Sequence, residues 1–554
     1  MEYGGYIKKL IFNNSSELEL NKDDIVVFVG PNNVGKSQSL KDINILCESD
    51  NKTKVITKIE VQKSDGDPIE LLEKIAQKDS RQSYYSGLNF SVYNSSAANF
   101  ARVKNFGLLK SVFVTHLTTE ERLQICHPAP NIPRNHSRSH PIHYAQFDRE
   151  HRKWLSNNFK KAFGKSLIPN ESYGSIVPLC IGEEVKFNHD FPNEHERYEE
   201  YAKILETYPQ VQDQGDGIKS FVGILLYLML DYHRIFLIDE PESFLHPPQA
   251  NIMGRIIGET LKNNQQAFIS THSEDLIKGI MSVSANRLKI VRITRTGDIN
   301  SFSVLNNEQL KNLWSDPILK YSNIMSSLFH KTVILCESDS DCKFYSIIDS
   351  YCAGLNKQYS ENLYIQSGGK HRMPLIITAL KSLGVETKII VDIDILNDEQ
   401  TLKRLIESSS INWDLISKDY QILDANLHSD KENINREDFF KGINKISELT
   451  KTNLTKKEIS YILEMVKTKS KWDNLKSYGI SAIPAGDAKQ AFDRINNTLI
   501  SNNIFIVPCG EIEGFVKSIG GHGPDWVNKV IEIYPDISHE VYKEVRDFLI
   551  TILH

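Results

Sequence analysis

Short apolar runs alternate with helix-like stretches over most of the chain. In the first half, the runs at 25–29 (IVVFV), 235–238 (IFLI) and 266–270 (QAFIS) have the length of strands. A run of about four to eight apolar residues between turn signals is typical of a strand buried in a parallel sheet. The alternation of such runs with helices predicts an α/β fold.

The same pattern starts again after about residue 325. Apolar runs at 332–336, 362–366, 388–391 and 503–508 are separated by helical stretches, which predicts a second α/β sheet. The segment 399–478 is mainly polar and helical, which indicates an insertion with a solvated face; nucleic-acid contact is the alternative. We therefore expect two domains, 1–325 with a helical part at about 145–230, and 326–554 with the insertion at about 399–478.

A turn rich in small residues follows the first buried run and reads GPNNVGKS, residues 30–37. A strand followed by G-x-x-x-x-G-K-S and a helix is the phosphate-binding P-loop pattern. Its glycines let successive backbone N–H groups converge on phosphate oxygens, and the helix adds the positive end of its dipole. Lys36 can reach the β- and γ-phosphates, and the Ser37 hydroxyl can ligate Mg²⁺. We expect the nucleotide-binding residues to be Gly30, Asn32, Asn33, Gly35, Lys36 and Ser37.

Two carboxylates, Asp239 and Glu240, end the buried run at 235–238. The carboxyl end of such a strand is where an α/β sheet places ligand chemistry. Asp239 can hold Mg²⁺ through water, and Glu240 can polarise an attacking water. The strand at 266–270 delivers His272, which taken alone would be a structural histidine. The cluster QGDGIKS at 214–220 taken alone marks only the start of an apolar helix.

Acidic residues also follow the apolar runs of the second half. Glu337 and Asp341 come after 332–336, and Asp392 and Asp394 come after 388–391. Carboxylates grouped at strand ends repel one another and raise their own pKa values unless a cation offsets them. Mg²⁺ or Mn²⁺ is the simplest explanation, because two such ions can activate water and stabilise the leaving oxygen of a phosphodiester. The alternative is a set of ordinary surface acids at strand–loop junctions.

Three further charged residues follow the last apolar run. Glu511, Glu513 and Lys517 are candidates for second-metal ligands and a phosphate contact, and the sequence does not choose among them or against ordinary loop charges. The glycine-rich turn at 520–526 ends in Trp526, which we expect to be exposed; capping of the last helices is favoured, and stacking on a base is the alternative.

A segment rich in Pro, His and Arg occupies residues 127–143. Its four histidines match no metal-ligand spacing. We therefore expect a solvent-exposed loop, with phosphate contact through Arg134 and Arg138 as the alternative.

Composition adds limits rather than a function. The net charge of −6 over 554 residues does not indicate a nucleic-acid binder and does not exclude one, since only a local basic surface is needed. The seven cysteines show no C-x-x-C pair, which indicates reduced thiols rather than a disulfide framework or a zinc site. No apolar run has the length to span a bilayer, and the N-terminus lacks an apolar signal core. These features predict a soluble, cytoplasmic protein without membrane contact.

In this order along the chain, the motifs resemble the OLD (overcoming lysogenization defect) family, in which an ABC-type ATPase head precedes a TOPRIM domain. GPNNVGKS is similar to Walker A, FLIDE to Walker B, and the FLHP that follows is characteristic of this branch. CESDSD stands where TOPRIM domains usually have V-E-G-x-x-D, with Ser338 replacing the glycine, and DID at 392–394 matches their D-x-D. The resemblance implies an α/β fold class with an ABC-type ATPase head followed by a Rossmann-like TOPRIM domain with a helical insertion.

The resemblance also implies roles for individual residues. Asp239 would hold the metal, Glu240 would be the general base, and His272 would be the switch histidine near the γ-phosphate. Gly215 and Gly217 stand at the signature position, although QGDGIKS departs from the usual LSGGQ, and would act on a nucleotide held by another subunit. In the TOPRIM domain the resemblance implies catalytic residues Glu337, Asp392 and Asp394, and metal ligands Glu337, Asp341, Asp392, Asp394, Glu511 and Glu513. The implied cofactors are ATP and Mg²⁺, with Mn²⁺ or Ca²⁺ as alternatives at the TOPRIM site.

We therefore expect an ATP-regulated, metal-dependent endonuclease that cuts DNA and serves in phage defence, similar to Gabija-type and retron-associated effectors. The expected partners are DNA, a second copy of the chain joined through the ATPase heads, and a defence-system protein or a reverse transcriptase–RNA/DNA complex. Two alternatives stay open: a TOPRIM ribonuclease that cleaves RNA such as tRNA, and an ATP-switched binding or assembly factor without cleavage.

Overall fold

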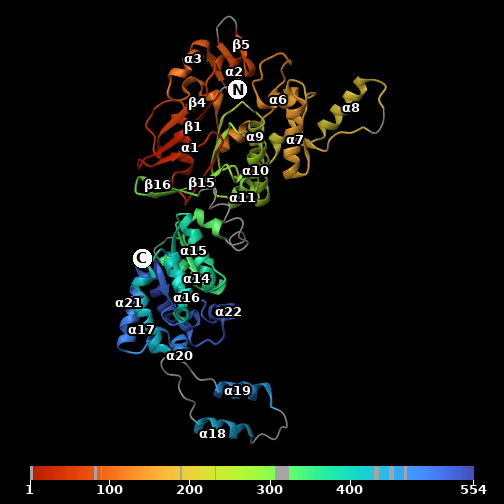
Figure 1. Ribbon diagram of the computed structural model, residues 1–554. Coiled ribbons are helices and arrows are strands. Elements are labelled where there is room, and N and C mark those ends of the chain that lie inside the picture. Colours follow the sequence, from red (N-terminus) through yellow and green to blue (C-terminus); the bar gives the residue numbers. More distant parts are fainter. Residues whose placement is uncertain are drawn as a thin grey trace. The chain divides into compact units, whose positions relative to one another are not determined.

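The computed structural model describes residues 4–79, 84–88, 90–187, 190–230, 232–305, 323–355, 357, 359–428, 436–447, 454–466 and 471–553. The chain forms two compact units, Met1–Asp316 and Pro317–His554. The first runs from red to green in Figure 1 and the second from green to blue. Both units combine helices with a parallel sheet, so the predicted α/β fold class is confirmed. The domain limits expected from the sequence, 1–325 and 326–554, stay a prediction.

A six-stranded sheet forms the centre of the first unit, with strand order β16-β15-β3-β14-β13-β8. Every neighbouring pair is parallel except β15 and β16. All residues of β3 and β14 are buried, which explains why these strands appear in the sequence as unbroken apolar runs. The carboxyl ends of β3, β13 and β14 meet at one edge of the sheet. The strands are β3 (Ile25–Val29), β8 (Val114–Leu117), β13 (Ile235–Asp239), β14 (Gln266–Ser270), β15 (Leu288–Thr296) and β16 (Ile299–Leu305).

Smaller sheets complete the first unit. One is antiparallel and contains β1 (Gly5–Phe12), β2 (Glu17–Glu19) and β4 (Ile56–Lys63), and another contains β5 (Gln77–Asp79), β6 (Tyr84–Gly87) and β7 (Phe90–Tyr93). Two-stranded pairs join β9 (Ala129–Pro130) to β11 (Ile176–Val177) and β10 (Ser166–Pro169) to β12 (Leu179–Gly182). The part expected to be helical at about 145–230 therefore also contains strands.

The helices of the first unit flank these sheets (Figure 1). They are α1 (Lys36–Leu46), α2 (Pro68–Ile75), α3 (Asn94–Ala98), α4 (Lys110–Phe113), α5 (Thr119–Gln124), α6 (Pro141–Phe147), α7 (Arg149–Phe163), α8 (Glu194–Glu206), α9 (Asp216–Leu228), α10 (Pro247–Thr260) and α11 (Glu274–Ser284). The sequence pattern alone suggests a strand leaving for a loop around Thr119, but α5 begins there. A reciprocal capping box between Thr118 and Glu121 starts this helix.

A four-stranded parallel sheet, with order β18-β17-β19-β20, forms the centre of the second unit. Its strands are β17 (Thr332–Cys336), β18 (Leu363–Gln366), β19 (Glu386–Val391) and β20 (Ile504–Ile506). They are joined and covered by α14 (Asp339–Leu355), α15 (Met373–Ser382), α21 (Asp487–Ile500), α22 (Gly523–Ile533) and α23 (Lys543–Leu553). The carboxyl ends of the four strands lie along one edge of this sheet.

Aromatic side chains fill the core between α14, α22 and α23. Trp526 is fully buried, its ring lies 5.2 Å from that of Phe344, and its indole N–H donates to the carbonyl of Ile519. The expectation of an exposed Trp526 that stacks on a base is therefore wrong. The sequence pattern misled because the glycines at 520–523 mark a turn, whereas Trp526 lies within α22, on the face that packs into the core.

The segment 399–478 is helical where the structure describes it. It contains α16 (Glu399–Ser408), α17 (Ser417–His428), α18 (Arg436–Ser447), α19 (Lys456–Val466) and α20 (Lys471–Tyr478). Apolar side chains of α16 and α17 are fully buried, and these helices pack on α15 and α21. This part of the segment therefore belongs to the core of the second unit. Among the helices described, none has the length and hydropathy needed to cross a bilayer.

The close packing of α10 on α11 gives a test of this fold (Figure 1). A Cβ added at Gly279 would lie 2.1 Å from the carbonyl oxygen of Asn251, and one at Gly254 would lie 2.2 Å from that of Leu276. Because rigid backbone fills the space, Gly279→Ala should lower the free energy of unfolding by about 1–3 kcal/mol. The midpoint of thermal unfolding should fall by several degrees.

Gly354→Ala is the matched control, because Gly354 lies in α14 with no atom near the position of the added Cβ. Its thermal midpoint should stay the same or rise slightly, since alanine favours helix. A Gly279→Ala protein that unfolds at the wild-type temperature would contradict the packing.

Candidate functional site

The P-loop turns between β3 and α1 at the edge of the first sheet. Gly30 and Gly35 have φ values of 143° and 100°, and a Cβ at Gly30 would lie 2.3 Å from the carbonyl oxygen of Ile293. Asn33 also has a positive φ of 62°, and Asn32 and Asn33 are exposed in the turn. Ser37 lies in the first turn of α1. The turn therefore depends on glycine both for its backbone conformation and for its contact with β15.

Lys36 is buried inside this turn. Its ammonium donates to the carbonyl oxygens of Gly30 and Pro31 at 2.9 and 2.8 Å. Burial lowers the pKa of Lys36 to about 8, while the nearby carboxylates of Glu240, Glu242 and Asp239 act in the opposite direction. The lysine is thus placed between the loop and the acidic residues that end β13.

Asp239 and Glu240 lie beside the end of β14. The Ser270 hydroxyl donates to a carboxylate oxygen of Asp239, and the Glu240 amide donates to the Ser270 carbonyl at 3.0 Å. The imidazole Nε2 of His272 is 3.9 Å from a carboxylate oxygen of Glu240. Burial lowers the pKa of His272, and the Lys36 charge lowers it further. The structure therefore brings Lys36, Asp239, Glu240 and His272 together, as the sequence analysis expected of this edge.

Glu240 has an unusual backbone conformation, with a φ of 45°. A non-glycine residue in this region carries backbone strain, which neighbouring contacts must offset. The next acid, Glu242, accepts the amide of His272 at 2.7 Å and ties the turn after β13 to the turn after β14. Glu242 was not singled out from the sequence, where a third acid after D-E-P resembles an ordinary loop charge.

Arg122 is a second residue that the sequence analysis missed. Its side chain is fully buried. Its guanidinium donates to the carbonyl oxygens of Leu117 and Asp239, to that of Glu240 at 3.1 Å, and to the hydroxyl of Ser220 at 3.1 Å. One side chain thus joins the ends of β8 and β13, the strained Glu240 peptide and helix α9. Nothing in the local pattern of a short charged helix indicates that this arginine is buried.

Helix α9 begins at the glycines of QGDGIKS. Gly215 precedes the helix in open space, whereas a Cβ at Gly217 would lie 2.6 Å from the carbonyl oxygen of Phe244. Gly217 therefore has a packing role within its own unit. The action of Gly215 and Gly217 on a nucleotide held by a second subunit stays a prediction.

The acids of the second unit gather at the carboxyl edge of its sheet. Glu337 follows β17, and its carboxylate accepts the amide of Asp392, which follows β19, at 3.2 Å. Asp341 lies in the first turn of α14 and accepts the amide of Ser338 at 2.8 Å. Asp394 lies in the short helix η6 (Ile393–Asn397), and the ammonium of Lys370 is 2.9 Å from its carboxylate. The structure therefore brings the four predicted acids to one edge.

Burial and repulsion between carboxylates raise the pKa values of Glu337, Asp341 and Asp392. Burial, and after it the charge of Asp394, raises the pKa of Glu337 to about 7. Burial and the charges of Glu337 and Asp341 hold the pKa of Asp392 well above its usual range, and burial raises that of Asp341. One carboxylate oxygen of Asp394 is buried, and no residue that the structure describes donates a hydrogen bond to it. An acceptor without a donor among crowded carboxylates suits a divalent cation, so the residues present fit Mg²⁺ or Mn²⁺.

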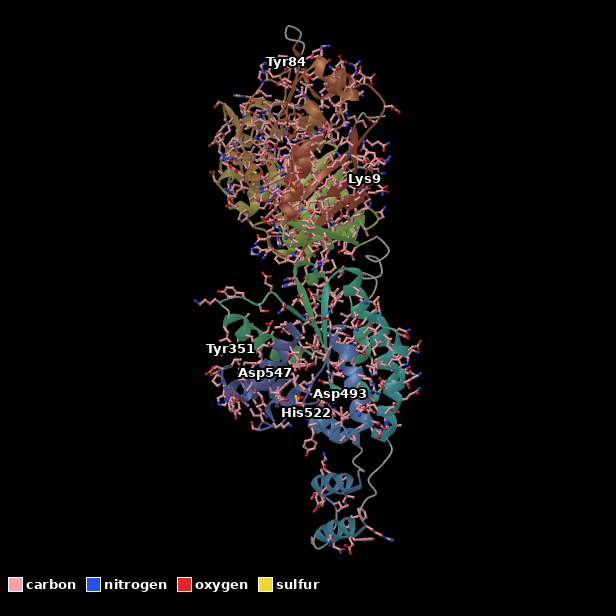
Figure 2. All side chains as sticks on the ribbon, turned by 90° about the vertical axis from the view of Figure 1, so that its left-hand side faces the viewer. Lys9, Tyr84, Tyr351, Asp493, His522 and Asp547 are labelled. Carbon is pink, nitrogen blue, oxygen red and sulfur yellow. The ribbon has the colours of Figure 1, made fainter. Side chains whose placement is uncertain are left out.

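The two late acids, Glu511 and Glu513, belong to one cluster but have different neighbours. Glu511, Glu513 and His522 form a group whose ligand atoms lie within 4.8 Å of one another. Lys476 of α20 contacts Glu511 at 2.6 Å, while Glu513 accepts the amide of Gly523 at 2.9 Å. His522, labelled in Figure 2, lies just before α22. The ammonium of Lys517 lies 6.0 Å from the centre of the Tyr478 ring.

The fold and these sites define a P-loop ATPase unit followed by an α/β unit with an acidic, metal-suited edge. Comparison with known families agrees. Residues 157–277, which include Asp239 and His272, match the family described as AAA ATPase domain. Residues 328–394, which run from before Glu337 to Asp394, match the family described as overcoming lysogenization defect protein-like, TOPRIM domain. The chain thus contains a segment that matches an ATPase domain, followed by a segment that matches the TOPRIM domain of OLD-like proteins.

Two curated proteins align with parts of the chain. The Old nuclease of Escherichia phage P2 is 23% identical over 172 residues, which is 30% of this chain and 28% of that protein. An uncharacterized protein of Methanocaldococcus jannaschii is 38% identical over 64 residues, which is 11% of this chain and 56% of that protein. The alignments thus span less than two thirds of either relative.

Among solved structures, SMC head domains are similar to part of the chain. The head bound to the C-terminal winged-helix domain of ScpA is 14% identical with a TM-score of 0.33, and the alignment covers 55% of this chain and 99% of that one. The head domain from Thermotoga maritima is 14% identical with a TM-score of 0.29, and the alignment covers 55% of this chain and 100% of that one.

The Arg122 contacts predict a separation of nucleotide binding from hydrolysis. Arg122→Lys replaces the planar guanidinium group by a single ammonium. The ammonium cannot hold the carbonyls of Asp239 and Glu240 together with the hydroxyl of Ser220. Lys36 and the P-loop are untouched, so a fluorescent ATP analogue should bind as to the wild type. Phosphate release should fall roughly 10- to 100-fold, since the strained Glu240 peptide loses its support.

Ser220→Ala is the milder companion variant, because it removes one hydrogen bond of Arg122 and leaves the carbonyl contacts in place. Its turnover should lie between those of the wild type and Arg122→Lys. Wild-type turnover by a folded Arg122→Lys protein would show that the contact has no part in positioning Glu240.

The acidic edge predicts a pH-dependent response to metal. Because the pKa of Glu337 is about 7 in the folded protein, the folded state binds protons more tightly than the unfolded chain. The stability of the metal-free protein should therefore fall as pH rises through about 7, and Mn²⁺ should raise the thermal midpoint more at about pH 8 than at about pH 6.

Differential scanning fluorimetry with and without Mn²⁺ measures this difference. In Glu337→Gln the side chain no longer titrates, so the difference between the two pH values should shrink. Equal Mn²⁺ shifts at both pH values in the wild type would contradict the raised pKa.

Proposed function

We propose that the chain is an ATP-regulated, divalent-metal-dependent endonuclease whose substrate is DNA. The observation that carries the proposal is the acidic edge of the second unit, where an oxygen of Asp394 is buried without a donor beside acids of raised pKa. Ordinary surface acids would be solvated and would show neither feature. The match of residues 328–394 to a TOPRIM family and the alignment with the Old nuclease support this choice.

In the first unit, the P-loop amides and Lys36 would bind the phosphates of ATP. Ser37 and Asp239 would hold Mg²⁺, which supplies charge neutralisation at the phosphates when bound. Glu240 would take the proton of the attacking water, and His272, close to Glu240, would lie beside the γ-phosphate. Arg122 would keep the Glu240 peptide in place during this step.

In the second unit, Glu337, Asp392 and Asp394 would hold the metal, with Asp341 behind them. Mg²⁺ or Mn²⁺ bound there would activate water and stabilise the leaving oxygen of a phosphodiester. Ca²⁺ is an alternative ion for the same oxygen ligands. Glu511 and Glu513 would complete a second ion site; the support is that their ligand atoms and that of His522 lie within 4.8 Å of one another. Lys370 would remain on Asp394 and fix its orientation.

Two subunits would pair through their ATPase units, with Gly215 and Gly217 of one acting on the nucleotide of the other. The signature helix α9 is tied by Arg122 to the residues that would hydrolyse ATP. Nucleotide state would thereby set how the units pair and when the acidic edge meets nucleic acid. The biological role we propose is phage defence, with a defence-system partner protein or a reverse transcriptase–RNA/DNA complex, and a cytoplasmic location.

A cleavage assay tests the proposal. Purified protein is incubated with Mg²⁺ or Mn²⁺ and either DNA or RNA, with and without ATP. Asp394→Ala should lower DNA cleavage by roughly 100-fold or more, because the cation loses a buried ligand. Glu240→Gln should lower ATP hydrolysis by about 10²- to 10⁴-fold and change the ATP dependence of cleavage, while the acids of the second unit stay intact.

The same assay separates the alternatives. Cleavage of RNA but not DNA by the wild type, lost in Asp394→Ala, would replace DNA by RNA as substrate. If wild type and Asp394→Ala behaved alike on every substrate, the nuclease assignment would fail, and an ATP-switched binding factor would remain.

A further inference from the structure

Lys476 introduces a positive charge into the acidic edge from a distant part of the sequence. It belongs to α20, in the segment 399–478, and its ammonium lies 2.6 Å from a carboxylate oxygen of Glu511. The Glu511 side chain is mostly buried, with 19% of its surface exposed, whereas that of Lys476 is 53% exposed. The lysine therefore approaches the edge from the solvent side and covers one of its acids.

The backbone fixes this lysine in place. A Cβ at Gly510, which has a φ of 103°, would lie 2.4 Å from the carbonyl oxygen of Lys476. A Cβ at Gly479, with a φ of 62°, would lie 2.0 Å from the carbonyl oxygen of Pro508. Trp472 and Leu475 of the same helix are buried. The helix and the loop before Glu511 thus meet backbone to backbone, so the start of the Lys476 side chain is held while its end is free to move.

The same loop contacts the predicted catalytic acids. The carbonyl of Gly510 accepts the amide of Ile393, the residue between Asp392 and Asp394, at 3.0 Å. Glu511 also adds to the repulsion that raises the pKa of Asp392. Lys476 consequently neutralises Glu511 at this edge. Lys370 contributes a second ammonium to the same edge, at Asp394. Each ammonium offsets part of the charge that the crowded carboxylates would otherwise carry.

A divalent cation at Glu511 and Glu513 competes with Lys476. The ligand atoms of Glu511, Glu513 and His522 lie within 4.8 Å of one another, and the Lys476 ammonium contacts this group at Glu511. Two cations on one carboxylate repel each other strongly in a partly buried site. Occupancy by one therefore favours departure of the other.

We propose that Lys476 is a built-in counter-ion of Glu511. A divalent cation displaces the Lys476 ammonium from Glu511, and the ammonium then binds a phosphate of the nucleic-acid substrate. The proposal rests on the proposed function and assigns to Lys476 a substrate-binding role at its acidic edge. An exposed ammonium on a fixed helix can move by rotation of its own side chain from Glu511 to a phosphate. Because each event favours the other, nucleic acid should tighten metal binding and metal should tighten nucleic-acid binding by the same factor.

Isothermal titration calorimetry with Mn²⁺ tests the displacement without relying on cleavage. Lys476→Met keeps the length of the side chain and removes its charge. In the absence of nucleic acid, it should bind Mn²⁺ at least about 5-fold more tightly than the wild type at the site that includes Glu511. Lys489→Met is the matched control, because Lys489 pairs with Asp493 on the exposed face of α21 and should leave Mn²⁺ affinity unchanged.

A second arm measures the coupling. With a non-cleavable DNA duplex bound, the Mn²⁺ affinity of the wild type and of Lys489→Met should rise, and that of Lys476→Met should stay constant. Thermal unfolding checks that each variant is folded, which the exposure of both lysines favours. Equal Mn²⁺ affinities of Lys476→Met and wild type, with or without DNA, would overturn the counter-ion role.

Glu511→Gln distinguishes this failure from that of the proposed function. If Glu511→Gln loses one Mn²⁺ site that the wild type has, the ion binds where Lys476 contacts the edge, and the comparison with Lys476→Met decides the proposal. If Glu511→Gln keeps every Mn²⁺ site of the wild type, the ion does not use Glu511, and the counter-ion role is wrong while the nuclease remains. A wild-type protein that binds no Mn²⁺ would end both.

Discussion

Carboxylates that are buried side by side cannot all keep their charge unless a cation joins them. This constraint governs the second unit. Its parallel strands all end at one edge, so the residues after β17 and β19 meet there whatever their sequence separation. The result is a set of acids with raised pKa values and a buried oxygen of Asp394 that has no donor. Such an arrangement lowers stability unless binding a divalent ion offsets it.

The first unit contains the opposite arrangement, a buried cation surrounded by oxygen atoms. Arg122 is fully buried, and carbonyl and hydroxyl oxygens from three parts of the chain accept its hydrogen bonds. Because these oxygens include those of Asp239 and Glu240, the acids that would act on ATP are fixed by the same side chain that holds α9. Asp239, Glu240 and helix α9 are therefore parts of one hydrogen-bonded network.

Much of both sites follows from the sequence, since buried parallel strands are unbroken apolar runs and the residues after them form the edge. This reasoning places Asp239 and Glu240 at one edge and Glu337, Asp392 and Asp394 at another. The P-loop pattern adds Lys36 to the first group, and the family resemblance adds His272. It fails where a contact depends on packing between distant segments. Arg122 resembles a surface charge on a short helix, Lys476 resembles one lysine among many in a polar segment, and Trp526 follows glycines that suggest an exposed turn. Tertiary packing places all three side chains, and the local sequence pattern does not show it.

The most direct test of the central claim is the location of bound Mn²⁺ in crystals of the protein grown at about pH 8, by anomalous scattering. We predict a peak between the carboxylates of Glu337, Asp392 and Asp394, which is absent in crystals of Asp392→Asn. Crystals in which Mn²⁺ is bound elsewhere on the protein while this edge shows no peak would contradict the account.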